Sequence, residues 1–166
     1  MSDIVETQTQ GEPATFVPSG GRIVVGVDSS PASKEALRAA ARIASLTGAT
    51  IDALGVWDFP IAYGYAEAHV RGMGGETGWS PENDAQKMLV ATVDEVFGPH
   101  RPAGLRTPLL QGHPAKRILE QADGASLIVV GSRGHGAFAG LMLGSVSAKC
   151  AAAASCPVLI VHAPAE

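Results

Sequence analysis

The sequence has few aromatic residues and no excess of basic charge. Aromatic residues make up 5% of the 166 residues, and 12 Lys and Arg are outnumbered by 16 Asp and Glu, which gives a net charge of −4. A generic nucleic-acid-binding protein needs a basic surface that displaces counterions from phosphates. Here the basic residues are scattered, with no cluster larger than Lys116-Arg117. The composition therefore argues against a nucleic-acid partner.

Long apolar runs and targeting signals are also missing. No stretch approaches the roughly 18 apolar residues that a membrane helix needs. Residues 1–20 contain no basic residue and no apolar core, so they lack the pattern of a signal peptide. We expect a flexible polar tail over residues 1–20, a single domain over residues 21–163, no membrane association and a cytoplasmic location.

Cysteine and histidine are too few or too dispersed to indicate a metal site. Cys150 and Cys156 do not form a C-x-x-C motif. Two small buried thiols are the simpler interpretation, and a redox pair is the alternative. The five histidines show no ligand spacing such as H-E-x-x-H, so we predict no dedicated transition-metal site. We interpret His113, which precedes Pro114, as a helix cap rather than a catalytic base.

What the chain does have is a regular alternation of apolar runs and helical patterns. Nearly unbroken apolar runs are typical of parallel strands that are covered on both faces. Strands are predicted over residues 22–28, 49–57, 104–112, 126–131 and 157–161. Helices are predicted between Ser30 and Gly48, after Ser80, and over residues 113–123 and 143–154. This order predicts an α/β fold, a five-stranded parallel sheet with helices on both faces.

Two segments depart from that pattern. Pro108 lies inside the third predicted strand, which is tolerable only near an edge or a bulge. Residues 58–80 are rich in glycine and aromatic residues, have no clear period, and form a long connection for a compact domain.

Ligands of such sheets bind at the carboxyl ends of the strands, where the strand order reverses. The chain places unusual residues there, above all the loop "GSRGHGAFAGLMLGS" at residues 131–145. A Walker A motif is excluded because its lysine and spacing are missing. Gly134, Gly136 and Ala139 match the dinucleotide pattern G-x-G-x-x-G/A, but they follow the fourth strand instead of the first, and no acidic residue follows at the required distance.

The remaining pattern is Gly131-x2-Gly134-x9-Gly144-Ser145, with an acidic residue at the end of the first strand. This spacing resembles the phosphate loop of the ATP-binding branch of the universal stress protein family, and the similarity extends over about residues 22–162. The resemblance implies a Rossmann-like fold of the adenine nucleotide α-hydrolase-like type, and ATP bound with Mg²⁺ or Mn²⁺. It also implies a homodimer joined through the strand at 157–161, whose apolar residues would form the seam.

The same resemblance indicates ten nucleotide-binding residues: Asp28, Val56, Gly131, Ser132, Arg133, Gly134, Gly144, Ser145, Val146 and Ser147. Gly131 and Gly134 would let backbone amides approach anionic oxygens. Gly144-Ser145 opens a helix whose N-terminus favours phosphate. Asp28 would lie near the ribose and phosphates, where its charge implies a bridging metal ion. Simpler interpretations stay open, namely Asp28 as a cap of the following helix and Val56 as a core residue.

The leading functional hypothesis is an ATP-binding regulator with little or no hydrolysis, whose nucleotide state alters a surface read by a regulatory protein partner. Arg133 is the one candidate for stabilising charge on a transferring phosphoryl group. An adenylating enzyme is one alternative, because "VGVDSS" at 25–30 is similar to the S-G-G-x-D-S loop of ATP pyrophosphatases. Val25 and Val27 depart from that loop, where they replace its serine and a glycine. A dimeric interaction module without nucleotide is the other alternative.

Overall fold

The computed structural model describes residues 20–58, 80–134 and 143–163, so the expected tail and most of the segment at 58–80 lie outside the described residues. The elements in chain order are β1 (Arg22–Val27), α1 (Pro31–Thr47), β2 (Thr50–Trp57), α3 (Pro81–Phe97), β3 (Leu105–Arg106), β4 (Leu109–Gln111), α4 (Pro114–Gln121), β5 (Leu127–Gly131), α5 (Ser145–Ala153) and β6 (Val158–Val161). Within these ranges, no helix is long and apolar enough to cross a membrane.

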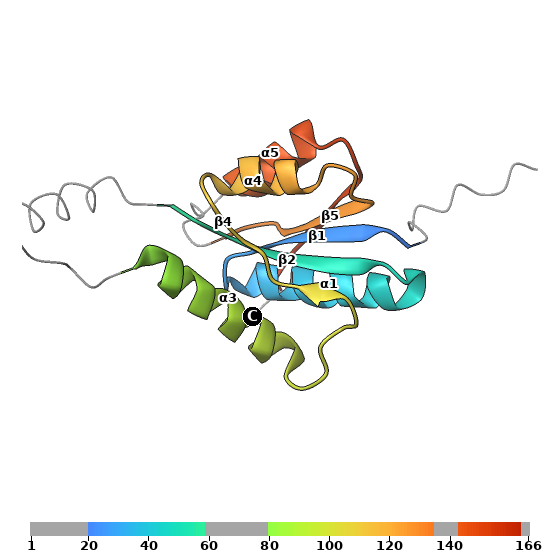
Figure 1. Ribbon diagram of the computed structural model, residues 1–166. Helices are drawn as coiled ribbons and strands as arrows, with labels where there is room; N and C mark the ends of the chain where they lie inside the picture. The colour runs from blue at the N-terminus through green and yellow to red at the C-terminus, as the bar shows by residue number, and fades with distance from the viewer. Residues whose placement is uncertain (1–19, 59–79, 135–142, 164–166) are drawn as a thin grey trace, which may run out of the picture.

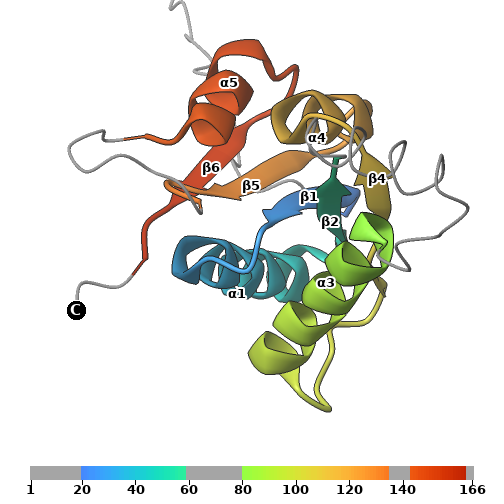
Figure 2. The ribbon, with the colours of Figure 1, turned by 90° about the vertical axis from the view of Figure 1, so that its left-hand side faces the viewer.

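The strands form one parallel sheet in the order β3-β2-β1-β5-β6, with β4 also paired to β2. Helices α1 and α3 cover one face of the sheet, and α4 and α5 cover the other (Figure 1; Figure 2). The predicted α/β fold with helices on both faces is therefore confirmed.

The third predicted strand is divided in two, so the sheet has six strands instead of five. β3 pairs with the start of β2, and β4 pairs with its end. Pro108 lies between them and has no N–H to donate, while its carbonyl accepts a hydrogen bond from the Gly55 N–H at 3.0 Å. The ladder is interrupted where proline was expected to be tolerated, at the edge of the sheet.

The helix termini follow the signals in the sequence, with one exception. The Ser30 side chain accepts from the Ser33 N–H at 3.2 Å, and Gly48 ends α1 with a φ of +72°. Ser80 caps α3 in the same way through the Asn83 N–H. His113 occupies the N-cap position of α4, but its side chain makes no capping hydrogen bond. His113 is thus the helix cap that the sequence predicts, although it caps by its position and not through its side chain.

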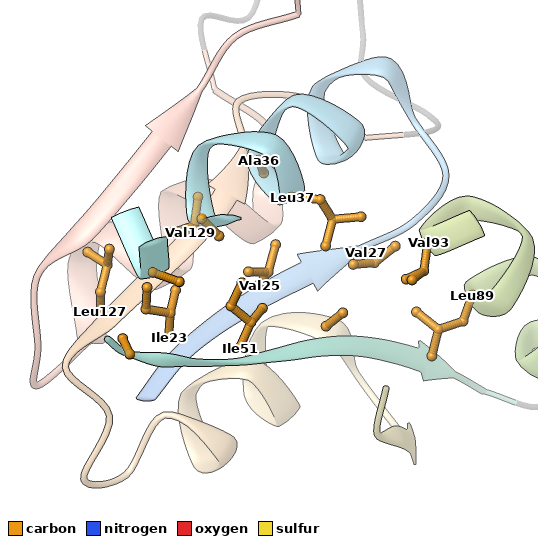
Figure 3. Packing of buried hydrophobic residues seen from close by; sticks show 14 residues of the cluster. Ile23, Val25, Val27, Ala36, Leu37, Ile51, Leu89, Val93, Leu127 and Val129 are labelled. Carbon is orange, nitrogen blue, oxygen red and sulfur yellow. The ribbon is translucent and has the colours of Figure 1, made fainter. Parts of the chain in front are cut away.

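Two apolar clusters hold the three layers together. Ile23, Val25 and Leu37 belong to the cluster between the sheet and α1 and α3 (Figure 3). Val24, Ile118 and other residues fill the cluster under α4 and α5. Successive residues of β1 are thus buried on opposite faces, as the unbroken apolar run predicts.

The cluster under α4 and α5 also contains a cysteine. Cys150 is fully buried, and burial raises its pKa to about 11. Cys156 is half-buried, and burial raises its pKa as well. Both thiols are free, and Cys150 is buried as the simpler interpretation expects, whereas Cys156 is buried only in part.

A buried charge lies near the amino end of β2. Asp52 is completely buried, and its carboxylate accepts hydrogen bonds from Arg106 at 2.7 and 2.9 Å, from Gln121 at 3.2 Å and from Arg22 at 3.3 Å. Burial disfavours the charged form, but the bonds from Arg106, Gln121 and Arg22 outweigh it and lower the pKa of Asp52. The charge is retained in the interior because three side chains satisfy it.

Candidate functional site

A cavity of about 410 Å³ lies at the carboxyl ends of β1, β2 and β5. This volume falls within the range of roughly 300–1,000 Å³ that small-molecule sites occupy. The strand order reverses between β1 and β5, so the cavity occupies the position where open α/β sheets bind ligands. Its lining consists of Gly26, Val27, Asp28, Ser30, Ser33, Leu54, Val56, Pro114, Ile118, Val130, Gly131, Arg133, Gly134, Gly144, Ser145, Val146 and Ser147.

The structure brings the candidate residues together around this cavity, with the exception of Ser132. Ser132 is buried and makes backbone hydrogen bonds instead. Its N–H donates to the Val161 carbonyl at 2.7 Å, and its own carbonyl accepts from the Gly144 N–H at 2.7 Å. Ser132 therefore ties β5 to β6 and to the start of α5. His135, Gly136 and Ala139 lie outside the described residues.

Asp28 supports the turn before α1, as the simpler interpretation expects, and it also lies at the cavity. Its Oδ1 accepts from the Ser30 N–H at 3.1 Å and from the Ser30 hydroxyl at 2.6 Å, so it organises the turn that leads into α1. Ser29 lies in that turn with a φ of +63°, a left-handed conformation that is uncommon for serine. The carboxylate also lines the cavity, where its Oδ2 lies against the Cα of Gly134 on the side that a Cβ would occupy.

Two glycines at the cavity, Gly131 and Gly26, also allow neighbouring elements to pack closely against the sheet. A Cβ on Gly131 would lie 2.9 Å from the Ala32 carbonyl carbon and 3.0 Å from the Ser33 nitrogen, so the first turn of α1 fills that space. Gly131 thus permits close approach of β5 and α1. Gly26 plays the same part for α4, because a Cβ there would lie 2.8 Å from the Ile118 Cδ1 atom.

The N-terminus of α5 differs from the other helix starts. Its N-cap is Gly144, which has no side chain to accept from the first turn, and its first residue is Ser145. The first N–H groups of a helix have no acceptor within it, and together they carry a partial positive charge. Both Ser145 and the following Val146 line the cavity. The other helices of the described chain begin with proline, namely Pro31, Pro81 and Pro114.

Ser147 lies in the same turn but is already engaged by the protein. Its side chain is buried, and its hydroxyl donates toward the Gly144 carbonyl at 3.0 Å and the Ser132 carbonyl at 3.1 Å. This residue fixes the first turn of α5 on the end of β5, so its hydroxyl is not available as a donor to a ligand.

The cavity has one apolar and one polar wall. Leu54, Val56 and Ile118 contribute the apolar side, and all three pack in the cluster under α4 and α5. Val56 is half-buried, so it is both a core residue and a lining residue. The polar side includes the serines of α1 and α5, and the exposed residue Arg133. A ligand with a flat apolar part and an anionic end matches this arrangement.

Several lining residues were not singled out as ligand-binding from the sequence. Ser33 and Ile118 lie on the inward faces of α1 and α4. Leu54 precedes Val56 by two positions and therefore shares its face of β2. Helical and strand periodicity already places each of these side chains inward, but only the packing of the elements shows that they meet at one cavity.

The described residues offer one carboxylate for a metal ion at the cavity, that of Asp28. In the described parts of the chain, no group of three or more His, Cys, Asp and Glu residues could hold a metal ion. Mg²⁺ is commonly held by one or two carboxylates together with substrate phosphates. The residues present thus fit a magnesium ion that is shared with a bound phosphate.

The family model for universal stress proteins matches residues 21–162. The chain belongs to the universal stress protein family. It is 32% identical over 167 residues to Universal stress protein Mb2019 of Mycobacterium bovis, covering 93% of this chain and 48% of that protein. A universal stress protein of Mycolicibacterium smegmatis is 33% identical over 145 residues, covering 84% of this chain and 45% of the relative. The chain thus spans about half the length of these curated relatives.

Solved structures of universal stress proteins share the fold. UspA from Lactobacillus plantarum aligns with a TM-score of 0.66 at 24% identity, covering 85% of this chain and 97% of that one. A universal stress protein in complex with cAMP aligns with a TM-score of 0.55 at 27% identity, covering 87% and 98%. The protein from Archaeoglobus fulgidus in complex with dAMP aligns with a TM-score of 0.59 at 26% identity, covering 85% and 97%.

Proposed function

We propose that this chain is an adenine-nucleotide-binding regulatory protein that holds ATP with Mg²⁺ in the cavity and hydrolyses it slowly or not at all. One observation carries the proposal: the N-terminus of α5, which has neither an N-terminal proline nor a side-chain cap, borders a cavity with an apolar wall. Free amides at a helix N-terminus bind phosphate, and an apolar wall suits a nucleobase. The cAMP and dAMP complexes of related proteins support adenine as the base.

The two walls give the ligand an orientation. The adenine ring would lie against Val56 and the apolar side, and the phosphates would lie at Gly144, Ser145 and Val146. Asp28 lies next to Gly134, where it would contact the ribose or share Mg²⁺ with the phosphates. Ser132 and Ser147 would support the site without binding the ligand through these groups, because their polar groups hold the start of α5 on β5.

We infer slow turnover from the cations among the described residues of the cavity. Phosphoryl transfer is catalysed by stabilising charge on the transferred group and by positioning the attacking water. Among the described residues that line the cavity, Arg133 is the one with a basic side chain, and it is exposed. A bound nucleotide would therefore act mainly as a signal that a protein partner reads. The cytoplasmic location remains part of the same proposal.

Variants of Ser145 test the site without removing a packed side chain. Ser145→Pro deletes one N–H at the first helical position, where proline is well tolerated, and the ψ of 164° at Gly144 suits a residue before proline. Ser145→Ala is the matched control, because it removes the hydroxyl and keeps the amide. A hydrogen bond to a charged group contributes about 1.5–3 kcal/mol, so we expect Ser145→Pro to weaken ATP binding about tenfold or more by calorimetry in Mg²⁺.

The loss in Ser145→Ala should be smaller. Equal affinities in wild type and Ser145→Pro would contradict the proposed phosphate position. Nucleotide released by acid from the purified protein identifies the natural ligand. Release of pyrophosphate from ATP in the presence of an acceptor would favour the adenylating enzyme. A protein that carries no nucleotide and gives no calorimetric signal with ATP, AMP or cAMP would favour the interaction module.

We also propose that the protein forms a homodimer through residues 157–161. In the described chain, β6 lies at the edge of the sheet and pairs with β5 on one side. Its four apolar residues are all half-buried: Val158, Leu159, Ile160 and Val161. The double variant Val158→Lys with Ile160→Lys should elute as a monomer, with its fold checked by circular dichroism. An unchanged elution volume of a folded variant would show that this seam is wrong.

A further inference from the structure

Helix α4 forms part of the apolar wall at one end and ends in a charged cluster at the other. It has eight residues, so its length is about 12 Å. Pro114 and Ile118 line the cavity. The space between Ile118 and the sheet is already filled, because its Cδ1 atom lies 2.8 Å from the position of a Cβ on Gly26. The shape of this wall therefore depends on where α4 lies.

The C-terminal end of α4 is held by one side chain from β1. Arg22 donates from Nη1 to the Gln121 carbonyl and from Nη2 to the Asp123 carbonyl, each at 2.6 Å. The last carbonyls of a helix have no donors within it, and a cation is favourable there. Arg22 is fixed in turn by Asp52, which also accepts from the Gln121 side chain at 3.2 Å. The first turn of α4 has no side-chain cap. In the middle of the helix, Arg117 donates to the Gln111 carbonyl at 2.6 Å, so Arg22 is the contact that holds its C-terminal end.

The geometry points to Arg22 as a positioning residue for the nucleotide site, acting through α4. Ile118 and Gln121 are three residues apart and therefore neighbours on the helix surface, so a shift at Gln121 is passed to Ile118 within one turn. The inference rests on the proposed function, since it assigns the affected wall to the base of the ligand. It places a determinant of ligand affinity at the amino ends of the strands, opposite the cavity.

Arg106 provides a matched control. It donates two hydrogen bonds to the same carboxylate of Asp52, but it makes no hydrogen bond to α4. Arg22→Lys and Arg106→Lys both keep a positive charge and lose the planar fork of the guanidinium. Only the first removes a clamp on α4.

The experiment measures the Kd for AMP and for adenosine by calorimetry, and hydrogen exchange of the ligand-free protein. Mutations along such coupled elements change affinity by about 2- to 30-fold, and we expect Arg22→Lys to raise the Kd within this range. The factor should be the same for adenosine, because the clamp acts on the base wall and not on the phosphate end. Backbone amides at 118–122 should exchange faster than in wild type. Arg106→Lys should leave both Kd values and this exchange unchanged.

Equal changes in the two variants, or an unchanged Kd in Arg22→Lys, would overturn the inference. So would a loss of affinity in Arg22→Lys that is confined to AMP. If Arg22→Lys does not fold, Gln121→Met removes the α4 side chain from Asp52 and should raise the Kd in the same direction, whereas an unchanged value would contradict the inference. If wild type binds no adenine compound, the proposed function fails, and the exchange measurement still tests the clamp: equal exchange in the two variants overturns it.

Discussion

Asp28 and Asp52 lie at opposite ends of the same sheet and have different surroundings. Asp52 is completely buried near the amino end of β2, and its carboxylate accepts from Arg22, Arg106 and Gln121. Asp28 follows β1 at the carboxyl end, organises a turn through Ser30 and lines a cavity. One carboxylate is enclosed by donors from distant parts of the chain, and the other borders open space. The carboxylate at the amino end of the sheet thus stabilises the fold, and the carboxylate at the carboxyl end is accessible from the cavity.

The helix termini repeat this difference. At the amino end of the sheet, the last carbonyls of α4 accept from Arg22. At the carboxyl end, the first turn of α5 has no side-chain cap. At the carboxyl end, α1 and α3 are capped by Ser30 and Ser80, so the first turn of α5 differs from them in having neither a side-chain cap nor a proline.

The largest expected difference between the two ends is in stability. Asp52→Ala leaves the partly buried donors of Arg22 and Gln121 without their acceptor, and each unsatisfied donor costs about 1–3 kcal/mol. Asp28→Ala removes acceptors for the Ser30 turn, a loss of about 1 kcal/mol that is comparable to losing a cap. Urea unfolding measures both changes. Similar losses of unfolding free energy in the two variants would show that the two ends of the sheet do not differ in their contribution to stability.

A second contrast separates two glycines at the carboxyl end. Gly131→Ala forces a Cβ against backbone atoms of α1 at 2.9 and 3.0 Å, and such overpacking costs about 1–3 kcal/mol. Gly144→Ala meets its nearest atom, the Ser132 carbonyl oxygen, at 3.4 Å, so its cost should stay near 0.5 kcal/mol or less. Thermal unfolding of the two variants compares them. A Gly131→Ala protein as stable as wild type would show that this close approach is not required.

Acid should lower the stability of the fold because Asp52 at the amino end of the sheet becomes protonated. Its folded-state pKa lies below the ordinary value of 3.8, because the bonds to Arg106, Gln121 and Arg22 outweigh the effect of burial. The unfolded chain therefore takes up its proton first as the pH falls. The contribution of Asp52 to stability is complete above about pH 5 and is lost as the pH falls through 3.8 toward the folded-state pKa.

The variant Asp52→Asn tests this dependence. Urea midpoints measured between about pH 6 and pH 3 should fall less steeply in Asp52→Asn than in wild type, because this variant has no carboxylate to protonate at that position. Equal slopes would mean that the buried carboxylate does not contribute to the acid sensitivity of the fold.

The smallest expected difference is in the reactivity of two thiols, one of them in α5. Cys150 of α5 is fully buried with a pKa of about 11, whereas Cys156 is half-buried. Because the thiolate is the reactive form, a disulfide reagent at about pH 8 should modify Cys156 first and Cys150 only slowly. Cys156→Ser should abolish the fast phase. A fast phase that survives in this variant would show that α5 opens readily.

Much of the fold could be predicted because its signals are local. Ser30 with Pro31, Ser80 with Pro81, and Gly48 mark helix ends at the positions where the structure has them. Pro108 marks the break between β3 and β4, although a single edge strand was expected there. These features depend on a few neighbouring residues, so the sequence is sufficient to place them.

The position of the site could be predicted from the sequence. Which of its residues line the cavity and which ones hold neighbouring elements together could not be predicted. Ser132 was expected at the ligand, yet its backbone groups are used by β6 and α5. Gly131 was expected to let backbone amides approach an anion; it lines the cavity, and α1 also fills the side on which its Cβ would lie. The partners of Asp52 lie 30, 54 and 69 positions away in the chain, at Arg22, Arg106 and Gln121. Such contacts arise only when separate elements pack, and local patterns do not encode them.

The break at Pro108 has a consequence for how molecules of this protein can associate. Two short strands with a proline between them do not offer a continuous row of backbone partners, whereas the strand at the opposite edge, in the described part of the chain, does. A sheet that can be extended on one side alone can join one neighbour, and growth then stops. In the homodimer proposed above, the proline would limit association to closed pairs.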